Sequence, residues 1–191
     1  MTMLLAVFRT NTGEVLDLSQ CQNITDVGVS SILKSIPNLL EPDLSYCCPV
    51  TPMVRSFQKI PKLVRSFQKI PKLRTLKLEG CKFMTDGLKS NGTSCVSLRE
   101  LLSLSKSSGV TDTELSFAVS RLKNLLKMNI TCRNITDVSL AAIISSCTSL
   151  ISLRMESCSH VSIGALRLVG KHCSHLEELD LTDSDLDDKA T

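Results

Sequence analysis

The chain has 191 residues and a net charge of +3, with 42% hydrophobic residues, 3% aromatic residues and no tryptophan. So small a net charge does not favour nucleic-acid binding, and no run of 18 apolar residues predicts a membrane span. Because aliphatic side chains dominate and rings are rare, we expect a core built of thin, repeating layers.

The first twelve residues carry no repeated pattern. Met1–Phe8 is short and apolar but lacks a basic start and a cleavage site, so it does not predict a signal peptide. We treat residues 1–12 as a short N-terminal lead. We expect the edge of the first strand to lack a cap, and an uncapped sheet edge can pair with other chains.

One phrase recurs through residues 13–191. It reads Leu73-Arg-Thr-Leu-Lys-Leu-Glu-Gly-Cys81 at one place and Leu150-Ile-Ser-Leu-Arg-Met-Glu-Ser-Cys158 at another. This is L-x-x-L-x-L-x-x-C, the core of a leucine-rich repeat. The last positions of the seven phrases are Cys21, Cys47, Cys81, Ser107, Cys132, Cys158 and Ser184. Successive phrases lie 25 or 26 residues apart, except for one interval of 34.

Each phrase predicts a short strand followed by a helix. Leucines that alternate along a strand place one face inward and the other outward. Four residues after most phrases comes a pair such as Thr136-Asp137. There the hydroxyl suits a helix N-cap and the carboxylate suits the positive end of the helix dipole. Since one repeat cannot bury its own apolar side, we predict an α/β leucine-rich-repeat solenoid of about seven repeats. A curved parallel sheet is expected on the concave face and helices on the convex face.

Three stretches interrupt the period. Pro42 stands where an inward leucine is expected, so a central strand should lose a hydrogen-bond donor. Residues 54–63 are repeated without change at 64–73, and the extra decapeptide should bulge from the convex side. One residue too many precedes Leu104, and one too few precedes Cys132. We expect irregular backbone around residues 40–75, 99–107 and 130–134, and a truncated last repeat.

The duplication also doubles a basic stretch. Residues 55–77 contain eight lysines or arginines and no acidic residue. We interpret this stretch as a solvated convex helix. A patch for an acidic partner or phosphate, or a nuclear-import tract, is the alternative.

Eight of the nine cysteines occupy two repeated positions, one at the end of the leucine phrase and one shortly before the next phrase. A small apolar side chain packs well there, which favours buried free thiols in a reducing compartment. The run His172-Cys173-Ser174-His175 offers too few ligands for zinc. No nucleophile–base pair or phosphate loop is visible, so we predict no catalytic residue, metal site or cofactor.

The candidate binding site follows from the alternation along the strands. Residues between the inward leucines should point out of the concave face, where a protein partner would bind. This surface is mixed in charge and poor in aromatic residues, so it favours steering and selectivity over affinity. The predicted partner-binding residues are Asp17, Asp43, Lys77, Glu79, Lys127, Asn129, Arg154, Glu156, Glu178 and Asp180.

The phrase C-x-x-[IV]-T-D-x-x-[LV], as in residues 21–29, resembles the cysteine-containing class of leucine-rich repeats. Residues 73–88 and 135–188 resemble plant F-box/LRR-repeat proteins. In that family an F-box binds a Skp1-type adaptor of a cullin ubiquitin ligase, and the repeats select the protein to be ubiquitylated. The resemblance therefore implies substrate recognition in the cytoplasm, the nucleus or both.

The chain departs from that family because the lead of residues 1–12 is too short for an F-box. Adaptor binding is therefore expected only if a longer form carries one, and a fragment or truncated copy of a receptor is one interpretation. An F-box-less regulatory or scaffold protein is an alternative. A small-molecule (hormone) receptor is a third possibility, but the long loops and basic aromatic pocket that it requires are not visible. A GTPase activator on a similar scaffold is the enzymatic alternative, and no motif supports it.

Overall fold

The computed structural model describes residues 7–8, 14–21, 24, 26–47, 70, 72–80, 97–102, 111–131 and 134–184. The strands of this part are β1 Val7–Phe8, β2 Val15–Asp17, β3 Glu41–Asp43, β4 Thr75–Lys77, β5 Glu100–Leu102, β6 Lys127–Thr131, β7 Ser152–Glu156 and β8 Glu178–Asp180. Its helices are α1 Asp26–Ser35, α4 Asp112–Val119, α5 Asp137–Ser146 and α6 Ile163–His172.

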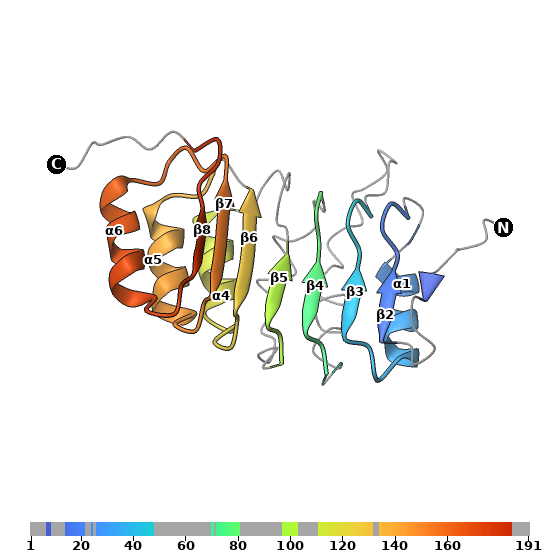
Figure 1. Cartoon of the computed structure of the whole chain (residues 1–191). Helices are drawn as coiled ribbons and strands as arrows, with labels where there is room; N and C mark the ends of the chain where they lie inside the picture. Colours follow the sequence, from blue (N-terminus) through green and yellow to red (C-terminus); the bar gives the residue numbers. More distant parts are fainter. Residues whose placement is uncertain are drawn as a thin grey trace.

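The described strands form one sheet in the order of the sequence (Figure 1). From β2 to β8, every neighbouring pair is parallel. Helices α4, α5 and α6 stack on one another along a single face of β6–β8 (Figure 1). The fold is therefore the predicted α/β leucine-rich-repeat solenoid, and we call the sheet face opposite the helices the concave face.

The N-terminal lead contains a strand that the sequence did not reveal. Val7 pairs with Asp17 and Phe8 pairs with Leu16, so that β1 runs antiparallel to β2. The expectation of an uncapped edge at the first repeat was wrong, because β1 covers the outer edge of β2. A strand of two residues has no period that a sequence pattern could show.

The core is a row of inward side chains contributed by one strand after another. Leu16, Leu76, Leu101, Met128 and Leu153 occupy equivalent register positions, and all are buried. Burying one such side chain stabilises the fold by roughly 1.5–3 kcal/mol. The layers are therefore held together mainly by contacts between neighbouring repeats.

Pro42 weakens the ladder between β3 and β4, as predicted. Directly after β3, the N–H of Leu44 donates to the carbonyl of Lys77 on β4, at 3.0 Å. The backbone nitrogen of Pro42, two residues earlier, also faces β4, but proline has no N–H to donate. The register between β3 and β4 accordingly contains the single pair Asp43–Lys77, whereas β2 and β3 share three pairs.

The irregularity expected at residues 130–131 was wrong. All five residues of β6 pair with β7 in unbroken register, from Lys127–Ser152 to Thr131–Glu156. Residues 132–133, which belong to the same stretch of the prediction, lie outside the described residues. Most of the duplicated segment at 54–73, and the extra residue before Leu104, also lie outside them.

Two of the hydroxyls predicted to cap helices, those of Thr136 and Ser162, do so. Thr136 is the N-cap of α5 and accepts a hydrogen bond from the N–H of Val138. Ser162 is the N-cap of α6 and accepts one from the N–H of Ala165. Such a cap stabilises a helix by about 1 kcal/mol.

The aspartates that begin α4 and α5 have a function that the sequence pattern did not indicate. Asp112 accepts hydrogen bonds from the N–H and hydroxyl of Thr136 and from the hydroxyl of Ser139, in the next repeat. Asp137 accepts from the N–H and hydroxyl of Ser162, again one repeat further on. Each aspartate therefore ties its own repeat to the following one.

At three described phrase ends, Cys47, Cys158 and Ser184, the side chain forms a similar link in the opposite direction. The Cys47 thiol donates to the carbonyl of Leu18 at 2.8 Å, and the Cys158 thiol approaches that of Ile130 at 3.9 Å. At the last phrase, the Ser184 hydroxyl donates to Met155 at 2.9 Å. This shared contact explains why serine can replace cysteine at the position. The described cysteines are all free.

Candidate functional site

The predicted partner-binding residues lie along the concave face. Asp17, Asp43 and Lys77 are register partners on β2, β3 and β4. Asn129, Arg154 and Asp180 form the corresponding row on β6, β7 and β8. Lys127 and Glu178 lie one row nearer the strand starts, while Glu156 ends β7 and Glu79 follows β4. These residues therefore share the sheet face on which the alternation placed them, and their role in partner binding stays a prediction.

An open hollow of about 630 Å³ brings some of these residues together. It lies over the carboxyl-terminal ends of the strands and extends from the turn after β2 to β7. The predicted residues that line it are Asp43, Lys77, Glu79, Asn129, Arg154 and Glu156. Five further lining residues are not among the predicted partner-binding residues: Ser19, Gln20, Ser45, Tyr46 and Thr131. Asp17, Lys127, Glu178 and Asp180 lie on the same face but do not line the hollow.

Each base among the predicted residues forms an ion pair with an acid on a neighbouring strand. Lys127 lies 3.0 Å from Glu100 on β5, and Lys77 lies 3.7 Å from Asp43 on β3. Such partly exposed pairs contribute about 0–1 kcal/mol each to stability. Their main consequence is that the positive charges of this face are already matched by acids of the same face.

The third pair is part of a small network on β7 and β8. Glu178 accepts a hydrogen bond from the Ser152 hydroxyl at 2.6 Å and another from Nε of Arg154 at 3.0 Å. These two bonds hold the pKa of Glu178 below its ordinary value, with Ser152 making the larger contribution. Glu178 therefore stays negatively charged near neutral pH and fixes the guanidinium of Arg154 on the face.

Tyr46 is the aromatic residue at the rim of the hollow. Its backbone has a φ of 58°, and its side chain is 38% exposed. The phenol donates a hydrogen bond to Glu79, and this bond, together with a smaller effect of burial, raises the pKa of Tyr46. The sequence signal was the position of Tyr46 immediately before Cys47, since the equivalent Gln20 also has a positive φ and also lines the hollow.

Asn129 contributes a polar atom without a partner. Its side-chain oxygen is buried and accepts no hydrogen bond from any described residue. A buried acceptor left unpaired is unfavourable, so Asn129 offers a bonding position to a donor that enters the hollow.

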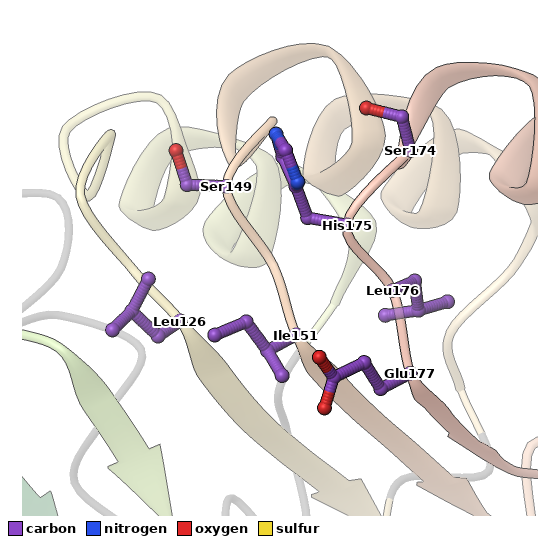
Figure 2. A pocket seen from close by; sticks show the side chains of 7 residues that line it. All are labelled: Leu126, Ser149, Ile151, Ser174, His175, Leu176 and Glu177. Carbon is purple, nitrogen blue, oxygen red and sulfur yellow. The ribbon is translucent and has the colours of Figure 1, made fainter.

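A second, smaller hollow of about 440 Å³ lies at the starts of β6, β7 and β8 (Figure 2). Leu126 and Ile151 lie along its floor, while His175 points toward the helix side, near Ser149 (Figure 2). Its remaining lining residues are Ser174, Leu176 and Glu177. No hydrogen bond links Ser149 and His175, so this hollow does not present an assembled nucleophile and base.

The described part of the chain holds neither a cluster of metal-ligating side chains nor a membrane-spanning helix. Within it, no three His, Cys, Asp or Glu side chains gather to hold a metal ion. No helix there combines the length and the apolar character needed to cross a bilayer. The basic stretch at residues 55–77 lies largely outside the described residues, and its interpretation stays a prediction.

Comparison with known proteins gives one family match. A family model described as Leucine Rich repeat matches residues 14–33 and 172–190. Among solved structures, internalin C2 from Listeria monocytogenes is 16% identical with a TM-score of 0.44, over 93% of this chain and 74% of that chain. The tropomodulin C-terminal domain from Caenorhabditis elegans is 11% identical with a TM-score of 0.44, over 85% and 83%. The yeast Rad7 and Elc1 complex is 14% identical with a TM-score of 0.39, over 89% and 56%.

A sheet that is parallel from β2 to β8, in sequence order, with inward leucines on most of these strands and helices on one face, has the leucine-rich-repeat fold. Solenoids of this fold present an extended concave surface on which binding can take place. The family match concerns leucine-rich repeats in general and does not distinguish the plant F-box/LRR-repeat group.

Proposed function

We propose that this chain recognises a protein partner on its concave face, through the hollow lined by residues of β3, β4, β6 and β7. The observation that carries the proposal is the convergence of Asp43, Lys77, Glu79, Asn129, Arg154 and Glu156 around one open depression. These residues come from repeats far apart in the sequence. A strand face that is merely exposed to solvent does not require a hollow lined by acidic, basic and amide side chains.

The geometry suits a macromolecule better than a small molecule. The hollow is open and polar, with an exposed tyrosine at its rim, whereas small-molecule sites are mostly enclosed and apolar. Tyrosine and arginine are the residue types that often dominate the energy of protein interfaces. Tyr46 and Arg154 supply one of each on opposite sides of the hollow.

At a finer level, the repeats are proposed to select substrates for a Skp1–cullin–F-box type ubiquitin ligase. Support for this comes from the resemblance of the C-x-x-[IV]-T-D phrases to plant F-box/LRR-repeat proteins. In this proposal a Skp1-type adaptor binds only to a form that carries an F-box, and the chain works in the cytoplasm or the nucleus.

The recognition proposal is tested by capturing partners with the purified chain and measuring each purified partner by titration calorimetry. Glu156→Trp places a bulky ring in the hollow. Ala141→Trp places the same ring on the exposed side of α5 and serves as the control. We expect the first variant to weaken binding at least about tenfold and the control to leave it within about twofold. Equal effects of the two variants would contradict recognition through the concave face.

The ubiquitin-ligase level needs a separate measurement. The chain is expressed with and without a fused F-box, and the half-life of each captured partner is followed. We expect the fused form to shorten that half-life and Glu156→Trp to restore it. Partners that bind the concave face but keep their half-life would leave recognition standing and refute the ligase role.

A further inference from the structure

The concave face has a charge opposite to that of the whole chain. The outward positions that the structure describes on this face carry eight acids, Asp17, Glu41, Asp43, Glu79, Glu100, Glu156, Glu178 and Asp180, and three bases, Lys77, Lys127 and Arg154. Their net charge is −5, whereas the chain as a whole carries +3. The described part of the concave sheet is therefore an acidic surface on a basic protein.

The three bases of this surface are engaged with its own acids. Arg154 is held by Glu178, Lys77 by Asp43 and Lys127 by Glu100. An incoming acidic partner would have to break these pairs and would meet the remaining negative charge. An incoming basic partner can leave them intact. Such complementarity accelerates encounter with the correct partner and disfavours partners of like charge.

The hollow contains the groups that a guanidinium or ammonium requires. Asp43, Glu79 and Glu156 provide carboxylates at its lining. The unpartnered oxygen of Asn129 provides a buried neutral acceptor. Tyr46 adds an exposed ring beside Glu79, and a cation near such a ring is attracted by roughly 0.5–1 kcal/mol. Arginine carries five donors and no acceptor, so it matches a lining of this kind.

The dimensions indicate an extended segment. Neighbouring strands lie about 4.8 Å apart, so the five intervals from β2 to β7 span roughly 24 Å. An extended chain covers this distance with about seven residues. Alternate side chains of such a segment would point into the face, and the others would point away from it.

We propose that the partner presents an extended segment rich in arginine or lysine, which lies across the strands of the concave face and inserts basic side chains into the hollow. This inference rests on the proposed recognition function and specifies the chemistry of the partner. A nucleic acid, or a membrane surface rich in anionic lipid, would be repelled by the same acidic surface.

The probe is a fluorescein-labelled peptide in which arginine and serine alternate, and binding is followed by fluorescence anisotropy with the full chain. A peptide of alternating glutamate and serine is the charge control. We expect the basic peptide to bind and the acidic peptide not to bind. The affinity of the basic peptide should fall at least about tenfold between low and physiological salt, because salt screens exposed charges.

The site is tested with the double variant Glu79→Gln/Glu156→Gln, which removes two charges while glutamine keeps an acceptor for Tyr46. Its control is Glu177→Gln/Asp183→Asn, which removes two exposed acids that do not line the hollow. We expect about a tenfold loss of peptide affinity for the first and less than about a twofold loss for the control. Equal losses, or binding of the acidic peptide, would overturn the inference.

The two proposals can fail separately. A captured partner that is lost with Glu156→Trp but unaffected by Glu79→Gln/Glu156→Gln would keep the recognition function and refute the basic segment. If Glu156→Trp weakens neither the captured partner nor the peptide, the recognition function itself fails.

Discussion

The ring of Tyr46 lies directly over Gly80, so that a β-carbon on Gly80 would come within 2.6 Å of Cδ1 of the ring. The two residues occupy equivalent positions, each immediately before a phrase-ending cysteine, in consecutive repeats. Gly80 has a φ of 66° and Tyr46 a φ of 58°. The glycine therefore allows both the left-handed turn and the close approach that holds Tyr46 at the rim of the hollow.

Gly80→Ala is expected to destabilise the fold by about 1–3 kcal/mol, because the new β-carbon meets both the left-handed strain and the ring. Urea unfolding followed by circular dichroism measures this change. In a double-mutant cycle, Tyr46→Ala should remove the part of the loss that is due to the ring. If the losses of unfolding free energy in Gly80→Ala and Tyr46→Ala simply added in the double variant, the ring would not constrain Gly80.

Gly170→Ala is the matched control, since Gly170 lies in α6 and an added β-carbon there meets no atom within 4 Å. It should stabilise the protein by up to about 1 kcal/mol, because alanine favours a helix over glycine. If both glycine substitutions lowered the free energy of unfolding, the result would indicate a general sensitivity to added side chains rather than a specific contact of Gly80.

Leu153 and Leu179 offer a comparison at one register position of successive strands. Leu153 is fully buried between repeats, whereas Leu179 is 40% exposed. Leu153→Ala should cost about 2–5 kcal/mol of unfolding free energy, since it leaves a cavity between layers. Leu179→Ala should cost about half of that or less. Equal costs would contradict the layered account of stability.

Asp112 should make stability depend on pH. Burial raises its pKa, but hydrogen bonds from Ser139 and Thr136 outweigh burial, so that the folded pKa lies below the ordinary 3.8. Because the folded pKa is depressed, its contribution is present above pH 3.8 and is lost as the pH falls through the folded pKa.

Asp112→Ala is expected to lose about 1–2 kcal/mol at neutral pH, because the carboxylate is partly exposed. Thermal unfolding against pH, with Asp112→Asn as the reference, should show the difference shrinking below pH 3.8. Glu177→Gln, which removes an exposed carboxylate just before β8, is the control. If the wild-type protein remained more stable than Asp112→Asn by the same amount below pH 3.8, this result would argue against the inter-repeat bonds of Asp112.

Cys147 should be unreactive in the folded protein. Burial, with a smaller contribution from Cys173, raises the pKa of the Cys147 thiol from 9.0 to about 12. Three pKa units lower the thiolate population about 1000-fold, and the thiolate is the reactive form. Iodoacetamide labelling at mildly alkaline pH, followed by peptide mass spectrometry, should therefore label Cys147 slowly.

The half-buried Cys21 is the internal comparison and should be labelled faster. Labelling in denaturant should reach every cysteine at similar rates. Rapid modification of Cys147 in the folded chain would mean that the repeat opens at this position.

The period of the leucine phrases was sufficient to predict the class of fold, the inward row and the capping hydroxyls of Thr136 and Ser162. It also placed Asn129 and Arg154 on the concave face, because alternation along a strand is a local property of the chain. The phrase spacing did not predict the register between β6 and β7. The prediction of irregular backbone at Thr131 was wrong. The five residues of β6 pair with β7 without interruption.

The sequence by itself determined what depends on neighbours within one repeat: the strand, the start of each helix and the side of the sheet on which a residue lies. Only the tertiary structure decided what depends on neighbours one or more repeats away. It showed β1 on the edge of β2, the bonds from Asp112 to Thr136, the ion pairs that engage the bases, and Tyr46 over Gly80. Contacts of this kind form when the repeats stack, and no period within a single repeat encodes which side chains will then meet.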